Sequence, residues 1–321
     1  MPDPLLYLKA AGASAIVSAL VVLATAGVRK SPGTAKLNWA CALGIASGLV
    51  AGFLVQSLRI AWPPANGLDR FFTIVIPAVL IVELISGIER LPSWIAWFLR
   101  MSLAATIPRI LLHDSIYLSH SDNDRTPWQN GVELAVSGGL LAALWGLLSG
   151  LSRRSPGASI PFALCMSISC AGVSVMLAGY IKGGAAAFPM AAAIMATTIV
   201  AWLITFRSGA TTQFSSSSIL GIAVVGLFGL LFIGRYFGRL STESALTILL
   251  ASLACWATEI PLLKHRKPWI VGTLRLVLVA IPLLVVLVLA KREFDRNMAP
   301  LLGSATASSG HVEAVSFSAS R

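Results

Sequence analysis

The sequence predicts an all-α integral membrane protein with about ten transmembrane helices. Its composition points to a bilayer, because 56% of the 321 residues are hydrophobic and only 12% are charged, whereas soluble domains carry roughly a quarter charged residues. The mean hydropathy is +0.83. The apolar residues lie in long continuous runs, unlike the short alternating segments of a transmembrane β-barrel. A recurring set of charged and aromatic residues is the third observation, and it predicts an internal repeat.

Each predicted helix follows from a length rule. The hydrocarbon core of a bilayer is about 30 Å thick and a helix rises 1.5 Å per residue, so a span needs about 20 mostly apolar residues. Backbone groups in lipid must bond within their own segment, and the runs are therefore expected to be helical. The fourth run is interrupted by Arg100, Pro108 and Arg109. The runs lie near residues 8–28, 37–58, 71–88, 92–112, 131–151, 160–181, 184–206, 218–238, 244–263 and 269–290.

Two distant apolar stretches share a motif of glutamate, proline, tryptophan, arginine and a second proline, in that order. The spacing from Glu to the first Pro is nine residues in both copies, and the spacing from Trp to Arg is six. A Leu-Gly-Ile-Ala segment at 43–46 recurs at 220–223, at nearly the same offset. The first copy is Glu83, Pro92, Trp94, Arg100 and Pro108, and the second is Glu259, Pro268, Trp269, Arg275 and Pro282.

These matches predict that the chain is duplicated. Spans one to four (8–112) would repeat as spans seven to ten (184–290), with the linking spans 131–181 between them. An even number of spans separates equivalent positions, so the copies would enter the membrane with the same polarity, as a parallel repeat. Alignment of hydrophobic helices by composition alone is the alternative. The transmembrane domain would cover 1–290, and the Ser- and Ala-rich segment 291–321 would be a disordered tail.

The net charge of +11 does not indicate nucleic acid, because the Lys and Arg residues are scattered through short loops, as topology signals and headgroup contacts are. The lipid bilayer of the cell (inner) membrane is the expected partner. Loops after odd-numbered spans carry more positive charge than loops after even-numbered spans. This bias favours a cytoplasmic position for the loops after odd-numbered spans, and it places both termini outside. Counting the basic residues of the two termini removes this bias.

Two acid–base pairs are the candidate functional residues. Glu83 and Arg100 lie on either side of the loop between the third and fourth spans, at a similar depth of roughly 8–12 Å, so they could meet. Glu259 and Arg275 stand in the same relation across the loop between the ninth and tenth spans. A charge in hydrocarbon costs about 2.5–3.5 kcal/mol on insertion scales, so such residues usually face the protein interior and pair. Either the four side chains bind a substrate or an ion, or each pair clamps its own hairpin.

Small and polar residues elsewhere allow further interpretations. Gly44, Gly48 and Gly52 share one face of the second span, and glycine pairs on the fifth and eighth spans repeat the spacing. Such faces allow close packing of helices, either within the molecule or in a homo-oligomer. The loop from 113 to 130 carries His113, Asp114 and His120 among other metal-ligating residue types, but their spacing matches no known site and favours a solvated loop. The four cysteines lie in apolar runs and are interpreted as packing residues.

Function is predicted from architecture. The chain has no Walker loop, nucleophile elbow, His-Glu-x-x-His helix or Cys-x-x-Cys pair, so no cofactor is predicted and an ordinary enzyme is unsupported. Tandem halves, interrupted helices and charges within the membrane favour a secondary transporter of a small molecule or ion. The alternatives are a non-catalytic membrane subunit or scaffold and, with less support, an embedded enzyme that uses the polar loop.

Overall fold

The computed structural model describes residues 4–26, 34–58, 60–88, 91–113, 115, 127–207, 217–259 and 268–316. Every regular element in these residues is helical. Eight helices are long and apolar enough to cross a membrane. They are α1 (Pro4–Ala26), α2 (Thr34–Val55), α5 (Ser93–Leu112), α6 (Pro127–Arg154), α7 (Ser159–Leu177), α9 (Ala187–Arg207) with the short α8 (Ile181–Ala185) before it, α10 (Ser217–Phe237) and α12 (Pro268–Ser316).

The segment expected to be the third span is helical throughout but not uniform. It consists of α3 (Gly67–Arg70), a π-helical turn at Phe71–Val75 and α4 (Ile76–Ser86). Three close approaches to α10 show that it runs antiparallel to that helix along its whole length: Gly67 to Phe237, Phe71 to Gly229 and Glu83 to Gly221. A π-turn inside a helix is often found at functional sites.

The segment expected to be the ninth span is also interrupted. It consists of α11 (Thr242–Ala251), which begins with the Ser241 side chain accepting a hydrogen bond from the Ser244 N–H, and a 3₁₀ helix at Ser252–Glu259. The seventh span is divided in a different way, because α8 precedes α9 as a separate short turn. Interrupted helices of this kind are tolerated at membrane depth where protein surrounds them.

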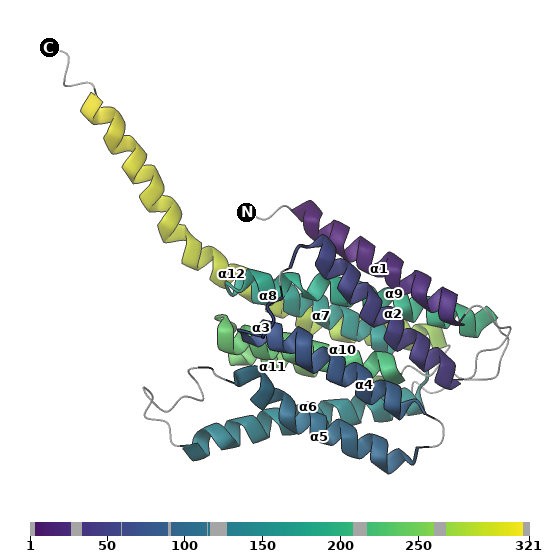
Figure 1. Cartoon of the computed structure of the whole chain (residues 1–321). Coiled ribbons are helices and arrows are strands. Elements are labelled where there is room, and N and C mark those ends of the chain that lie inside the picture. The colour runs from purple at the N-terminus through teal and green to yellow at the C-terminus, as the bar shows by residue number, and fades with distance from the viewer. Residues whose placement is uncertain are drawn as a thin grey trace.

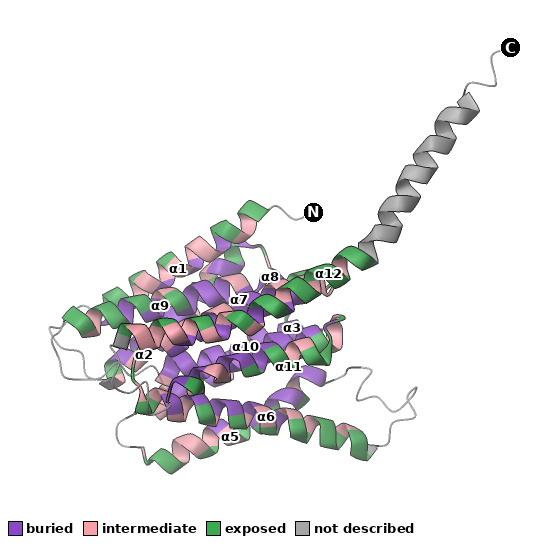
Figure 2. Ribbon diagram, turned by 180° about the vertical axis from the view of Figure 1, so that it is seen from behind, coloured by how far each residue is buried: buried purple, intermediate pink, exposed green. Residues whose placement is uncertain are grey.

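Helix α10 occupies the centre of the molecule. Most of its residues are buried, and Figure 2 shows it enclosed by the other helices. Helices α1, α2 and α9 lie together on one side of it, and α5 and α6 form a pair on the other side (Figure 1). Large apolar side chains on the outer helices are exposed, as a lipid-facing surface requires; examples are Ile16, Leu54 and Phe98.

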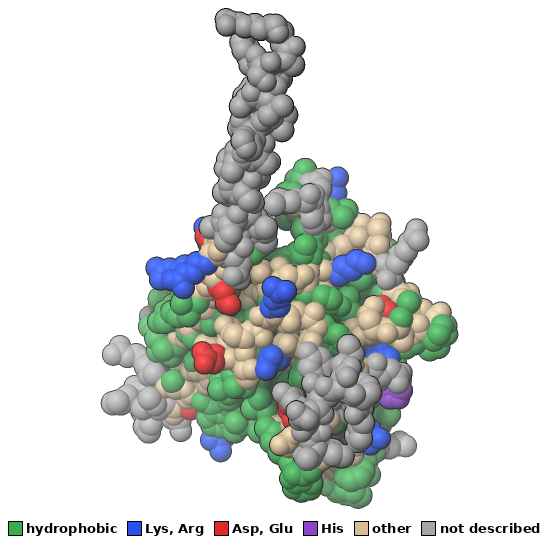
Figure 3. Space-filling model, turned by 90° about the vertical axis from the view of Figure 1, so that its left-hand side faces the viewer, with side chains coloured by type: hydrophobic (Ala, Val, Ile, Leu, Met, Phe, Trp, Pro, Cys, Tyr) green, Lys and Arg blue, Asp and Glu red, His purple; other side chains and the backbone are tan. Residues whose placement is uncertain are grey.

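Successive helices alternate in direction, so their ends form two faces. We call one the ion-pair face, because it contains the joints 86–93, 154–159 and 207–217, close to both Glu–Arg pairs. We call the other the opposite face, and it contains the joints 55–67 and 237–242. Figure 3 views the molecule from the opposite face, where charged side chains are scattered among uncharged ones and hydrophobic side chains surround them.

Two predictions about the elements can be compared with the structure. The glycine face of α2 packs within the molecule: a Cβ added at Gly44 would lie 2.4 Å from Val22, and one added at Gly48 would lie 1.9 Å from Ser18 of α1. Helix α12 continues beyond Ala290, where the sequence placed the start of a disordered tail. The side chains after Arg296 lie outside the described residues, and the state of the tail stays a prediction.

Candidate functional site

The first predicted pair forms an enclosed ion pair. Arg100 Nη2 donates to Glu83 Oε2 at 2.7 Å, and Arg100 Nε donates to Glu83 Oε1 at 3.0 Å. Two parallel bonds of this kind are the strongest arrangement of a guanidinium and a carboxylate. Glu83 on α4 is 1% exposed and Arg100 on α5 is 4% exposed. The same Nη2 atom donates to the Ser217 hydroxyl at 3.1 Å, and Ser217 is the first residue of α10.

Aromatic and small residues complete the surroundings of this pair. The guanidinium carbon of Arg100 lies 5.6 Å from the centre of the Trp97 ring and 5.8 Å from that of Trp145, a residue of α6. Such contacts stabilise a desolvated cation. On the acid side, a Cβ added at Gly221 of α10 would lie 2.1 Å from Glu83 Oε1. The pair therefore connects α4, α5, α6 and α10, and the missing side chain of Gly221 leaves room for the Glu83 carboxylate.

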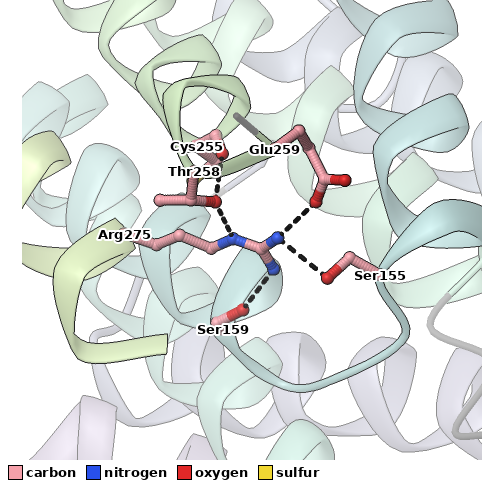
Figure 4. Close-up of polar contacts among 6 residues, drawn as sticks. All are labelled: Ser155, Ser159, Cys255, Thr258, Glu259 and Arg275. Atoms are coloured by element: carbon pink, nitrogen blue, oxygen red, sulfur yellow. Dashed lines mark hydrogen bonds and ion pairs between the residues drawn. The ribbon is translucent and has the colours of Figure 1, made fainter. Parts of the chain in front are cut away.

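The second predicted pair also forms, with more hydroxyl partners (Figure 4). Arg275 Nη2 donates to Glu259 Oε1 at 2.8 Å, and Arg275 Nε donates to the Thr258 hydroxyl at 2.7 Å. Its remaining donors reach Ser159 at 3.1 Å and Ser155 at 2.8 Å. Arg275 is 3% exposed, whereas the Glu259 side chain is 20% exposed. This pair joins α12 and the 3₁₀ helix to the turn between α6 and α7.

The two sites have the same plan. In each, an arginine near the start of one helix binds the glutamate at the end of the preceding segment and a serine from a third place in the chain. The sequence-based prediction that each Glu could meet its Arg is confirmed by the two ion pairs. Sequence reasoning did not identify the serines, because a hydroxyl contact between distant segments leaves no periodic signal. A role for the four charged residues in binding substrate stays a prediction.

A cavity of about 510 Å³ lies toward the opposite face, between α6, α10 and α11. Its interior is apolar, and polar side chains are found at its outer end, where the Tyr236 hydroxyl donates to Glu133 Oε1 at 2.7 Å. Arg235 lies beside them, with its guanidinium carbon 6.0 Å from the centre of the Tyr236 ring. Sequence reasoning missed this place because its residues come from three separate helices. The lining residues are Trp128, Gln129, Val132, Glu133, Val136, Ser137, Leu140, Phe228, Leu231, Phe232, Arg235, Tyr236, Thr242, Ala245, Leu246 and Leu249.

A second cavity, of about 690 Å³, lies between α7, α9 and α12. It is lined almost wholly by apolar side chains such as Phe162, Met195 and Leu284. Such a surface suits lipid chains and offers little for a polar ligand. Neither Glu83 nor Glu259 is among the residues that line these two cavities. In this structure the two glutamates are therefore seen in ion pairs and not at the wall of either cavity.

In the part of the chain that the structure describes, no group of three His, Cys, Asp or Glu side chains lies close enough together to hold a metal ion. The backbone carbonyl of His113 accepts a hydrogen bond from Arg70. Asp114 and His120 lie outside the described residues. All four cysteines are buried and unpaired with one another, in agreement with a packing role.

No family model, no curated protein and no solved structure matches the chain. The apolar helices define it as a multi-pass integral membrane protein of the all-α class.

Proposed function

We propose that this protein is a ten-span secondary transporter of a small molecule or ion in the cell (inner) membrane. The proposed number of ten spans includes the segments 67–86 and 242–259 in addition to the eight long apolar helices. The first of these lies along the whole of α10, and the second is joined to α12 through Arg275. The common plan of the two Glu–Arg sites supports a parallel repeat of 8–112 and 184–290. Repeats and interrupted helices are recurrent features of transporters.

One observation carries the proposal: ion pairs connect the helices at one face, while a cavity extends from the other face to the central helix. Arg100 and Arg275 each connect helix ends that are far apart in the sequence. The cavity lining includes Phe228 and Phe232 of α10. A transporter that exposes its site to one side at a time needs such an asymmetry between closed and open faces. In the other state the ion pairs would separate, and Glu83, Arg100, Glu259 and Arg275 would then contact the substrate or ion.

The chemistry of the cavity indicates the kind of substrate. Its volume of about 510 Å³ lies within the range of about 300–1,000 Å³ found for small-molecule sites. Apolar side chains line most of the wall, and Glu133, Arg235 and Tyr236 lie together at the outer end. A molecule with an apolar body and a polar or charged end would satisfy both parts. We expect such molecules to bind in preference to fully polar solutes.

The proposal is tested by thermal unfolding of the purified protein in the presence of candidate solutes. A ligand at 100 times its dissociation constant should raise the free energy of unfolding by about 2.7 kcal/mol. Replacing Tyr236 with Phe removes the hydroxyl at the cavity mouth and should reduce this response, whereas the control Glu243→Gln, an exposed acid of α11, should keep it. A compound that stabilises the wild type is then tested for uptake into proteoliposomes. Binding without uptake would count against transport.

A non-catalytic membrane subunit or scaffold is the second candidate. One observation favours it: Arg100 and Arg275 both bind protein partners and line neither of the two cavities. The scaffold interpretation predicts that no solute stabilises the protein and that weakening either pair lowers stability without changing which residues water can reach.

A further inference from the structure

The cavity of about 510 Å³ beside α10 has the form of a groove whose floor is a row of aromatic rings. Phe228, Phe232 and Tyr236 follow one another at intervals of four residues, so they share one side of α10. Their ring centres lie 5.5 Å and 4.5 Å apart along the row. Helices α6 and α11 both pack on α10 and form the two walls. The floor is therefore an apolar surface that runs along the helix and ends at the phenol of Tyr236.

The groove is long enough to hold much of one acyl chain. Tyr236 follows Phe228 by eight residues, and Leu140 follows Glu133 by seven residues on α6. At 1.5 Å per residue, each of these two stretches covers about 10–12 Å. Half of the hydrocarbon core of a bilayer is about 15 Å thick. The apolar part of the groove therefore extends through most of one membrane leaflet.

The groove is open along its side. Val132, Val136 and Leu246 line it, and their side chains are 42%, 64% and 39% exposed. They belong to α6 and α11, which both cross the membrane in the proposed ten-span arrangement. The opening between these two helices therefore faces the hydrocarbon of the bilayer, and a ligand can enter the groove from the membrane.

The polar end of the groove carries both signs of charge. The Tyr236 hydroxyl donates to Glu133 Oε1 at 2.7 Å, and the guanidinium carbon of Arg235 lies 6.0 Å from the centre of the same phenol ring. A carboxylate and a guanidinium therefore flank one aromatic side chain. A ligand with a single charge would bring that charge near a group of the same sign, which is unfavourable. A zwitterion satisfies both groups.

This polar end has the residue types that proteins place at the level of lipid headgroups. Trp128 lines it and is 78% exposed, and exposed tryptophans are enriched at the interface between membrane and water. Arg235 lies in the last turn of α10. Basic residues at such helix ends bind the phosphates of lipid headgroups. The groove therefore matches a lipid in both its apolar length and its polar end.

We propose that the groove binds a membrane phospholipid whose headgroup combines a phosphate with a primary ammonium, the chemistry of phosphatidylethanolamine. One acyl chain lies along Phe228 and Phe232. Arg235 binds the phosphate with its planar fork of N–H donors, and Glu133 accepts hydrogen bonds from the ammonium. Tyr236 positions the Glu133 carboxylate through the phenol hydrogen bond.

The same contacts predict which headgroups bind less tightly. A quaternary ammonium, as in phosphatidylcholine, has no N–H to donate to Glu133. Phosphatidylglycerol has no ammonium, so its phosphate would lie near the Glu133 carboxylate without a cation between them. The lipid binds to this groove whether or not the protein moves it across the membrane. That the lipid is also the transported substrate rests on the proposed function.

The test is thermal unfolding of the full-length protein, purified in detergent and freed of lipid, with added phospholipids that differ only in headgroup. The melting temperature of the wild type should rise with phosphatidylethanolamine and then saturate. The midpoint concentration should be about tenfold lower than for phosphatidylcholine or phosphatidylglycerol, which corresponds to about 1.4 kcal/mol. Glu133→Gln should remove this preference, because it weakens the bond to the ammonium. Ala245→Phe, which places a ring in the groove, should abolish the response to all three lipids.

Glu243→Gln is the matched control. Glu243 is an acid in the first turn of α11, it is exposed, and it does not line the groove. The variant should keep the wild-type response to each phospholipid. If Glu133→Gln or Ala245→Phe does not fold, Arg235→Gln provides the test, and it should weaken the binding of all three phospholipids because all three carry a phosphate.

Three results would overturn the proposal: equal midpoint concentrations for the three headgroups in the wild type, a preference that survives in Glu133→Gln, or equal stabilisation by free phosphoethanolamine. The last result would assign the polar end to a soluble compound and not to a lipid. Phosphatidylethanolamine binding in a protein that moves neither lipid nor solute in proteoliposomes would leave this site intact and refute the transport proposal. Solute transport without a headgroup preference would do the reverse.

Discussion

The side chain of a buried arginine shows how residue chemistry fixes this structure. A guanidinium has five N–H donors and keeps its charge, so within the membrane it must find acceptors in the protein. Arg100 finds a carboxylate with two bonds and one hydroxyl, whereas Arg275 finds one carboxylate bond and three hydroxyls. Arg100 therefore depends on Glu83 for its hydrogen bonds more than Arg275 depends on Glu259.

This difference predicts unequal effects of neutralising the two acids. Glu83→Gln should lower the free energy of unfolding by about 3–5 kcal/mol, the usual cost of leaving a buried charge without its partner. Glu259→Gln should cost less, approaching the ~1 kcal/mol of an exposed pair, because Glu259 is 20% exposed and hydroxyls remain around Arg275. Denaturation in detergent micelles measures both values. Equal losses would contradict the assignment of the first pair as the tighter one.

At the scale of elements, glycine determines where helices can approach each other. The third span touches α10 at two glycines, Gly221 beside Glu83 and Gly229 beside Phe71. In lipid, no hydrophobic effect brings helices together, so close packing at small residues becomes an important source of association. The glycine contacts of α10 therefore hold in register the helix that provides Glu83.

Substituting Gly221 tests this idea. Gly221→Ala should destabilise the protein by about 1–3 kcal/mol, as overpacking does, and should displace Glu83 from Arg100. Gly139 on α6 is the matched control, because a Cβ there would have no neighbour within 4 Å, and Gly139→Ala should be neutral or stabilising by up to about 1 kcal/mol through helix propensity. The melting temperatures of the two variants are measured in parallel. A lower melting temperature for Gly139→Ala than for Gly221→Ala would contradict the account.

Sequence periodicity was informative for some elements and not for others. Apolar length predicted the long helices, and the depth of two charges on either side of a loop predicted each ion pair, because both depend on local spacing. The π-turn at Phe71–Val75 and the separate α8 were not predicted, since they follow from packing against α10 and α7. The hydrogen bond from Gln56 to the Ala185 carbonyl and the cavity near Glu133 depend on contacts between distant segments, which the spacing of residues in one sequence does not predict.

At the scale of the whole molecule, the two faces differ in kind. Ion pairs and serine contacts connect the helix ends at the ion-pair face, and the cavity with its polar outer end lies toward the opposite face. Transport by alternating access requires that the closed face opens and the open face closes in turn. If the two faces are coupled, breaking the Glu83–Arg100 ion pair must alter the cavity, although 45 or more residues of sequence separate Glu83 from the residues that line it.

Accessibility of single introduced cysteines to a membrane-impermeant maleimide, added from either side, tests this central claim most directly. The native cysteines are buried and give a low background. In the otherwise unaltered protein, Ser137→Cys in the cavity should react only from the opposite face, and Ser217→Cys beside Arg100 should react slowly from both sides. Adding Glu83→Gln should expose residue 217 from the ion-pair face and protect residue 137. Unchanged labelling at residue 137 in a folded Glu83→Gln protein would contradict alternating access and favour a scaffold held by clamps.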